Sequence, residues 1–174
     1  MKKTINLFID MDGTVAQFYH DKKCLEKMYE KGYFEKLPAY AIAKEIDAFA
    51  KQDSCIEIYI LSACVNSEYC EEEKRKWLEK NMPNISPKNF IFTKVGESKL
   101  AKVINTLDLK FMERVNILLD DYTANLVDWQ KSTDCIGIKY INGFNNKSLK
   151  WIGEKVKTFG GLMKIMQRIA VYGN

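Results

Sequence analysis

Two pairs of aspartates follow short apolar runs that are far apart in the chain: Asp10 with Asp12, and Asp120 with Asp121. Short apolar runs that end in polar residues are typical of buried strands. In a parallel sheet, ligands bind outside the carboxyl ends of the strands. We therefore expect these carboxylates to meet at one rim of a sheet.

Groups that could bind an anion hold similar positions. Ser62 and Ala63 follow another apolar run, and Lys99 opens an amphipathic stretch that comes after a third run. A hydroxyl, a backbone amide and an ammonium all donate hydrogen bonds, and a phosphate accepts them from each. These residues are therefore candidates for binding a phosphate beside the carboxylates.

A cluster of carboxylates and phosphate-binding donors predicts a particular chemistry. Neighbouring carboxylates repel one another, and their pKa values rise unless a cation neutralises them. A hard divalent ion such as Mg²⁺ resolves the repulsion and also coordinates substrate oxygens. A carboxylate beside such an ion can attack phosphorus and form an aspartyl-phosphate. The pattern therefore predicts Mg²⁺-dependent chemistry on a phosphate.

Each motif has a simpler explanation when it is taken alone. Asp-x-Asp-Gly is common in turns, and Asp120 with Asp121 could cap the next helix. Ser62 at a strand end is uninformative, and Lys99 could be an ordinary surface lysine. Because the motifs occur together, each at a strand-to-helix junction, the whole set favours a site.

The elements that would position these groups alternate along the chain. Apolar runs predict strands over 5–9, 56–61, 90–92, 115–119 and 136–141. Apolar residues at helical spacing predict helices around 42–49, 71–80, 100–107, 126–129 and 162–169. This alternation predicts an α/β fold with a doubly wound parallel sheet.

The interval between the first two predicted strands is longer than one crossover helix needs. Its segment Phe18–Leu37 is rich in charged and aromatic residues, which predicts a small helical cap insertion at approximately 16–40. We expect a single domain over residues 1–174. A cap this small closes over a small substrate or leaves the site open.

The motif set resembles that of the haloacid dehalogenase-like (HAD) superfamily of phosphatases. Four stretches between residue 4 and about 141 match its motifs in order: Asp10-x-Asp12-Gly13-Thr14, Leu61-Ser62, Lys99 and Leu119-Asp120-Asp121. The resemblance implies that Asp10 is the nucleophile. Asp12 would be the acid/base that protonates the leaving oxygen and then activates water.

The same resemblance implies a phosphate site and a metal site. Ser62, Ala63 and Lys99 would hold the phosphate, with Lys94 as an alternative to Lys99 because the spacing around the third motif is loose. Mg²⁺ would be held by four aspartates, one of them through its backbone carbonyl: Asp10, Asp12 (the carbonyl), Asp120 and Asp121.

Within the superfamily, the chain is most similar to the 5′(3′)-deoxyribonucleotidases. Phe18 stands at the spacing where that family places an aromatic ring against the nucleobase. Gly32-Tyr33-Phe34 resembles the segment that closes its pocket, and Glu73-Lys74 with Trp77 resembles a helix whose lysine lies near the phosphate. Phe18, Phe34 and Lys74 are thus expected to contact substrate; alternatively, the two rings fill the cap core and the lysine is solvated.

Two departures from that family leave the substrate open. The insertion is shorter than the mammalian cap, and Ala63 replaces a second hydroxyl. The leading hypothesis is a phosphomonoesterase, a 5′-nucleotidase acting on (deoxy)nucleoside monophosphates. The alternatives are a phosphatase of another small phosphometabolite, such as a sugar phosphate, and a non-catalytic phosphate-binding protein. A signalling receiver domain is disfavoured because its acidic pair comes first in the chain, whereas here it comes last.

Composition sets the remaining expectations. Hydrophobic residues make up 47% and charged residues 29% of the 174 residues, a balance typical of a globular protein. The net charge of +4 is too small to indicate a surface that binds a nucleic-acid polymer. No apolar stretch approaches the ~20 residues of a bilayer span. Five cysteines and one histidine without Cys-x-x-Cys favour free thiols over a zinc site. We expect a cytoplasmic protein without membrane contact, compatible with a homodimer.

Overall fold

The strands form one parallel sheet. The computed structural model describes residues 4–52, 55–108, 111, 113–144 and 151–172. Within them, a six-stranded sheet has the order β3-β2-β1-β4-β5-β6, and every pairing is parallel. The strands are β1 (Ile5–Ile9), β2 (Ile56–Cys64), β3 (Phe90–Lys94), β4 (Val115–Asp120), β5 (Cys135–Tyr140) and β6 (Lys155–Val156).

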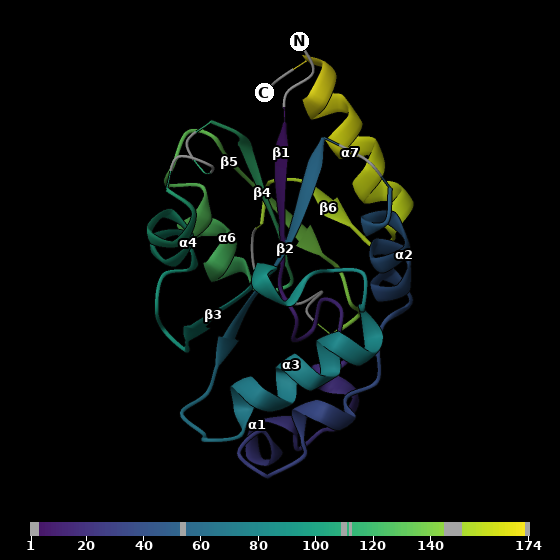
Figure 1. Ribbon diagram of the computed structural model, residues 1–174, viewed down its shortest axis with the longest axis vertical. Coiled ribbons are helices and arrows are strands. Elements are labelled where there is room, and N and C mark those ends of the chain that lie inside the picture. Colours follow the sequence, from purple (N-terminus) through teal and green to yellow (C-terminus); the bar gives the residue numbers. More distant parts are fainter. Residues whose placement is uncertain (1–3, 53–54, 109–110, 112, 145–150, 173–174) are drawn as a thin grey trace.

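Helices cover both faces of the sheet, which confirms the predicted doubly wound α/β fold (Figure 1). On one face lie α2 (Ala41–Ala50) and α7 (Phe159–Tyr172), with α3 (Cys70–Asn81) near the carboxyl ends of the strands. On the other face lie α4 (Lys99–Leu107) and α6 (Thr123–Trp129).

Side-chain alternation along the strands divides the core into two layers. In β1, Ile5, Leu7 and Ile9 belong to the cluster that packs against α2, α3 and α7. Phe8, between them, belongs to the cluster under α4 and α6, where it meets the ring of Trp129 at 5.0 Å. Because both faces are covered, the strands are apolar along nearly their whole length.

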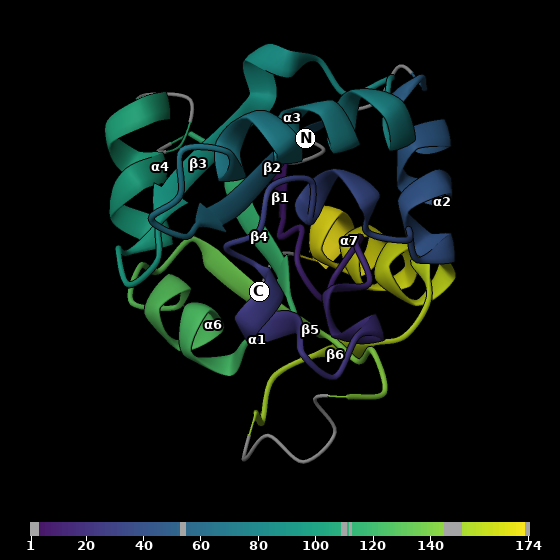
Figure 2. The same ribbon diagram turned by 90° about the horizontal axis from the view of Figure 1, so that it is seen from below.

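The residues expected to form the cap contain only short helical segments. These are η1 (Phe18–His20), α1 (Cys24–Lys27) and η2 (Phe34–Lys36), each of three or four residues. Figure 2 shows α1 in front of the strands when the molecule is viewed from below. The cap segment therefore faces the carboxyl end of the sheet.

Several boundaries differ from the predicted ones. β2 and β3 run past their apolar residues to Cys64 and Lys94, because their last residues pair with each other in register. The pairing of β6 with β5 was not predicted; β6 has two residues, too few for a period to show.

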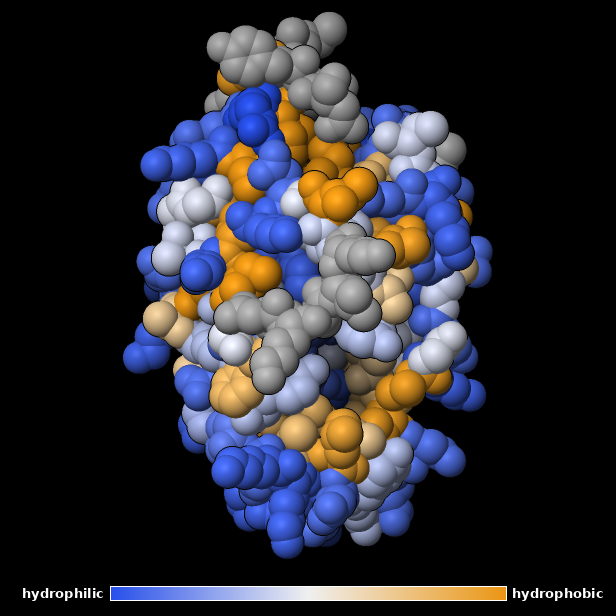
Figure 3. All heavy atoms as spheres, turned by 180° about the vertical axis from the view of Figure 1, so that it is seen from behind, coloured by the Kyte–Doolittle hydropathy of each residue, from blue (hydrophilic) through white to orange (hydrophobic). Residues whose placement is uncertain are grey.

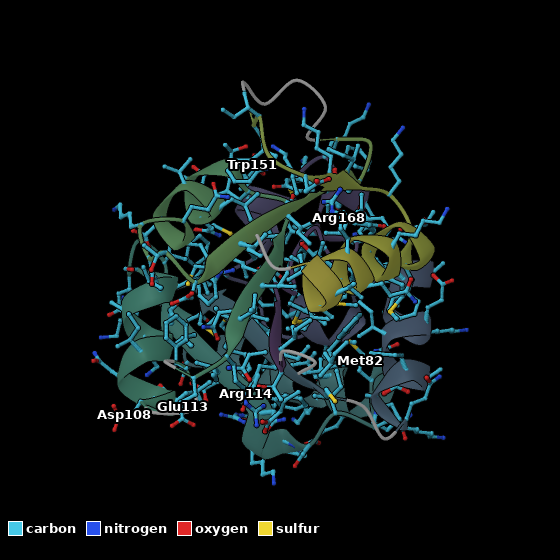
Figure 4. All side chains as sticks on the ribbon, turned by 90° about the horizontal axis from the view of Figure 1, so that it is seen from above. Met82, Asp108, Glu113, Arg114, Trp151 and Arg168 are labelled. Atoms are coloured by element: carbon cyan, nitrogen blue, oxygen red, sulfur yellow. The ribbon has the colours of Figure 1, made fainter. Side chains whose placement is uncertain are left out.

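The amino ends of the strands carry a separate polar cluster, in the region that Figure 4 views from above. Asn6 and Asn116 are completely buried and hydrogen-bond to each other at 2.9 Å. Arg114 donates to Asn6 at 3.1 Å and to Glu57 at 2.8 Å. This network satisfies buried polar groups at the end opposite the cap.

Two smaller expectations concern thiols and membranes. The five cysteines are free, as predicted. In the part of the chain that the structure describes, no helix combines the length and the apolar character needed to cross a membrane.

Candidate active site

The strand order explains why residues more than a hundred positions apart meet. From β1 the chain adds β2 and then β3 on one side, and it returns to add β4, β5 and β6 on the other. The carboxyl ends of β1 and β4 therefore flank the point where the direction of winding reverses, where open α/β sheets form their binding crevice. Asp10 directly follows β1 and Asp120 ends β4.

Strand alternation aims these two aspartates at the same helix. Phe8 and Leu118 pack under α4 and α6. Asp10 and Asp120, two residues further along their strands, continue on that face. Lys99, the first residue of α4, meets both: its Nζ lies 2.5 Å from Asp10 Oδ1 and 2.7 Å from Asp120 Oδ2.

The start of α4 is itself fixed in place. Ser98 is the N-cap, and its Oγ accepts a hydrogen bond from the amide of Ala101 at 3.1 Å. The same hydroxyl donates to Asp128 Oδ2 of α6 at 2.6 Å. Lys99 is only 3% exposed, so it is not the ordinary surface lysine of the simpler explanation.

Asp121 completes a buried triad of carboxylates. One oxygen from each of Asp10, Asp120 and Asp121 lies within 4.8 Å of the others, and all three residues are buried. Burial raises the pKa of Asp10 to about 7; Lys99 opposes the rise, and Asp120 adds to it. Burial also raises the pKa of Asp121, with Asp120 and Asp10 contributing. One ammonium does not neutralise three carboxylates, so the triad could hold a metal ion.

The loop after β1 is shaped to let the triad form. Gly13 has a φ of +83°, a conformation that disfavours residues with a Cβ. A Cβ at this position would lie 2.5 Å from Asp121 Oδ2. Asn142 Nδ2, just beyond β5, donates to both Asp121 Oδ2 and the Gly13 carbonyl at 2.9 Å. The turn and the carboxylate are therefore held together.

Asp120 and Asp121 do not cap the following helix. The N-cap of α6 is Tyr122, which makes no side-chain capping bond. Asp120 instead accepts from the Tyr122 amide at 2.7 Å and from Asn125 Nδ2 at 2.9 Å. These bonds orient its carboxylate within the crevice.

A second buried lysine serves the other side of the rim. Ile58 and Ile60 of β2 pack on the face that α3 covers, so Ser62 points toward α3. There the Nζ of Lys74 donates to Ser62 Oγ at 3.0 Å and to the Ala63 carbonyl at 2.6 Å, and it pairs with Asp12 Oδ2 at 2.5 Å.

Lys74 is completely buried and is not a solvated helix lysine. Burial alone would lower its pKa, but the charge of Asp12 raises it overall. Its ammonium also lies 4.6 Å from the centre of the Phe34 ring, a cation–π distance. The Asp12 carboxylate therefore has a cation of its own and stands apart from the triad; its Oδ1 is buried without a hydrogen-bond partner.

A cavity of about 890 Å³ opens over the carboxylates. Asp10, Asp12 and Ala63 line it, and Phe18 and Phe34 of the cap contribute an aromatic wall. The two rings are nearly parallel, with centroids 6.4 Å apart and an interplanar angle of 18°. Both rings thus reach the cavity while remaining largely buried in the cap, at 7% and 2% exposed.

The remaining lining of the cavity and the outside of the cap differ in polarity. Val95 and Tyr122, both more than half exposed, also line the cavity. The tip of the molecule formed by the cap is mostly hydrophilic in the space-filling view from behind (Figure 3). On this face the tip of the cap is therefore mostly polar, although Leu25 and Tyr29 of the cap are exposed and line the cavity.

The structure separates the two candidate phosphate lysines. Lys99 touches the carboxylates, whereas Lys94 is exposed at the cavity wall. The amide of Lys94 donates to Glu97 Oε2 at 2.9 Å, within its own loop. Of the two, only Lys99 has its ammonium paired with the aspartates of the crevice.

Sequence reasoning did not assign Asn125, Asn142 or Glu73 to the site. Asn142 follows β5, so the rule that selected the aspartates at strand ends would have found it. Asn125 lies one turn into the segment after β4 and reaches back to Asp120. Glu73 is adjacent to Lys74, and its carboxylate turns toward the cap.

The comparisons with known proteins show the fold and no more. No protein-family model matches the chain, and no curated protein matches it. Among solved structures, it is similar to DsGPDH of Dunaliella salina, with a TM-score of 0.61 and 16% identity over 92% of this chain and 28% of that one.

It is also similar to the Pnkp1/Rnl/Hen1 complex, with a TM-score of 0.55 and 17% identity over 79% of this chain and 46% of that one. The chain thus spans less than half the length of either structure. At these identities the likeness supports the α/β architecture alone.

Proposed function

We propose that this protein is a Mg²⁺-dependent phosphomonoesterase of the HAD type that removes phosphate from nucleoside monophosphates through an aspartyl-phosphate. The observation that carries the proposal is the buried ammonium of Lys99 between Asp10 and Asp120, with Asp121 completing a carboxylate triad at the reversal point of the sheet.

The donor set fits Mg²⁺. The triad offers carboxylate oxygens, the ligands that hard divalent cations prefer, and no soft ligand belongs to it. Asp10, Asp120 and Asp121 would hold the ion, with the Asp12 carbonyl as the further ligand that the resemblance implies. Bound there, Mg²⁺ would neutralise the cluster and polarise a phosphate oxygen.

The protein residues would divide the reaction between them. A carboxylate oxygen of Asp10 attacks phosphorus, the bond from phosphorus to the ester oxygen breaks, and Asp12, which enters this step protonated, gives that oxygen its proton. Water then attacks the phosphorus of the aspartyl-phosphate and Asp12, now a carboxylate, takes a proton from the water. The bond from phosphorus to Asp10 breaks, which frees the Asp10 carboxylate and releases inorganic phosphate.

The two lysines support these roles. The positive charge of Lys99 opposes the effect of burial on Asp10 and so favours its nucleophilic carboxylate form. Lys74 would hold the Asp12 side chain in position at the rim of the crevice. Lys99, Ser62 and the Ala63 amide would bind the transferred phosphate.

The cap side of the cavity favours a ring-bearing leaving group. A volume of about 890 Å³ lies within the range of about 300–1,000 Å³ that is usual for small-molecule sites. Phe18 and Phe34 line it, and the more exposed ring, Phe18, is the one that a nucleobase could contact; stacking on an aromatic ring is worth roughly 1–3 kcal/mol per base. A sugar phosphate would leave this surface unused.

A screen for phosphate release tests the proposal. We expect Mg²⁺-dependent hydrolysis across 5′- and 3′-(deoxy)nucleotides to exceed that of sugar phosphates. Asp10→Asn should abolish turnover while the circular dichroism spectrum stays unchanged, and Asp134→Asn, an exposed carboxylate elsewhere, is the matched control.

Each outcome has a definite reading. Appreciable turnover by the Asp10→Asn variant would exclude Asp10 as the nucleophile. Preference for sugar phosphates would overturn the substrate assignment. Absence of hydrolysis across the whole panel would overturn the enzyme and favour a phosphate-binding protein.

A further inference from the structure

Glu73 of α3 sends a buried carboxylate into the cap instead of into solvent. The residue is 5% exposed. Its Oε1 accepts a hydrogen bond from the amide of Gly32, and its Oε2 accepts one from the amide of Phe34 at 3.1 Å. Hydrogen bonds to an ionised acceptor are about twice as strong as neutral ones. One carboxylate thus binds both ends of the three-residue stretch 32–34.

That stretch controls the aromatic wall of the cavity. Phe34 lies parallel to Phe18, and the hydroxyl of Tyr33 donates to the Phe18 carbonyl at 3.1 Å. Gly32 has a φ of +84°, which lets the chain turn toward the carboxylate. Fixing the amides of Gly32 and Phe34 therefore fixes the position of both rings.

The neighbouring residue on the same helix holds the other half of the site. Lys74 pairs with Asp12, and its ammonium lies over the ring of Phe34. One turn further on, Trp77 Nε1 donates to the carbonyl of Leu37 at 2.6 Å. The helix α3 thus fixes the aromatic wall at a set distance from the carboxylate that would protonate the leaving group.

We infer that Glu73 is a positioning residue that determines selectivity for ring-bearing leaving groups, by holding Phe34, and through it Phe18, against the cavity. The role of Glu73 in substrate selectivity rests on the function proposed above, whereas its role in holding the cap does not. Glu73 lies outside the lining of the cavity, so it acts through the rings that it positions.

The test is Glu73→Gln, which keeps the size of the side chain but replaces one acceptor by an NH₂ group that faces an amide donor. Glu72→Gln is the matched control, because Glu72 is exposed on the same helix and pairs with Lys76 at the surface. Circular dichroism and thermal melting verify that both variants are folded.

Two readouts are measured. Hydrogen exchange at the amides of Gly32 and Phe34 should accelerate about tenfold or more in Glu73→Gln, as expected when a charge-assisted hydrogen bond is lost, and should not change in Glu72→Gln. KM for a nucleoside monophosphate should rise about tenfold, while kcat/KM for methyl phosphate, which lacks a ring, should stay the same.

A second variant keeps the positioning of the cap by α3 testable if Glu73→Gln does not fold. Trp77→Phe removes the hydrogen bond to Leu37 but keeps an aromatic ring in the core. It should also raise KM for the nucleotide more than that for methyl phosphate.

The results separate this inference from the proposed function. Unchanged exchange at both amides would overturn the holding role of Glu73. Accelerated exchange with equal effects on nucleotide and methyl phosphate would overturn the selectivity. If the unaltered protein hydrolyses no ester, the proposed function fails, and the exchange rates alone still decide whether Glu73 holds the cap.

Discussion

Replacing Gly13 by alanine should weaken the proposed metal site more than it destabilises the fold, and Gly96 provides a matched control. Gly13 and Gly96 have nearly the same φ, +83° and +88°. A side chain at such a φ costs about 1–2 kcal/mol in either place. A Cβ on Gly96 would meet no atom within 4 Å, whereas one on Gly13 would lie 2.5 Å from Asp121 Oδ2.

The difference between the two variants isolates the displacement of Asp121. To restore ordinary contact at 3.4 Å, its carboxylate has to retreat by about 1 Å, and the hydrogen bond from Asn142 is lost. Disturbing a group that orients a metal ligand costs about 10–100-fold in affinity. We expect that loss of Mg²⁺ affinity for Gly13→Ala and none for Gly96→Ala.

The assay is thermal melting at increasing Mg²⁺ concentration. At 100 times the dissociation constant, a bound ligand adds about 2.7 kcal/mol to the free energy of unfolding. For a chain of this size that raises the Tm by about 5–11 °C. The Gly13→Ala curve should need about 10–100 times more Mg²⁺ for the same rise. Equal Mg²⁺ dependence in the two variants would refute the role assigned to Gly13 and to Asp121.

Three further predictions test other parts of the site. Lys99→Met should lower the free energy of unfolding by about 3–5 kcal/mol in urea titrations, because it leaves buried carboxylates uncompensated. The control Lys94→Met, at an exposed site, should change the free energy of unfolding by under about 0.5 kcal/mol. Equal losses in the two variants would contradict the buried ion pairs of Lys99. Phe18→Ala should raise KM for nucleotides more than for p-nitrophenyl phosphate, and equal effects would count against base stacking. Chelation of divalent ions by EDTA should lower the Tm and Mg²⁺ should restore it, whereas a Tm indifferent to both would exclude a metal in the triad.

The aspartates of the crevice were predictable because strand ends can be identified in the sequence. The runs before Asp10 and Asp120 are buried throughout, so both ends are marked clearly. The prediction did not require the order of the strands in the sheet, since the carboxyl ends of all parallel strands lie at the same rim. The pairing of Lys99 with both aspartates could not be predicted, because it depends on strand alternation and on the start of α4.

The spacing of apolar residues in the sequence indicated that Lys74 is buried, but the many charged residues around it favoured the opposite prediction. Lys74 lies three and four positions before Trp77 and Leu78, so the three share one face of α3. The helix is strongly charged, and a lysine on it reads as solvated unless this spacing is weighed. In the cap, by contrast, segments of three or four residues are too short for any periodicity to appear.

The two buried lysines show how the fold could assign different roles to neighbouring aspartates. Asp10 leaves β1 on the face covered by α4 and is paired with Lys99, which it shares with Asp120. Asp12, in the loop that follows, pairs with Lys74 from the opposite layer. A carboxylate within the triad is suited to attack beside a metal, and one outside it is suited to exchange a proton. The layer from which each lysine comes would therefore separate the proposed nucleophile, Asp10, from the proposed acid/base, Asp12, which lies two residues further along the chain.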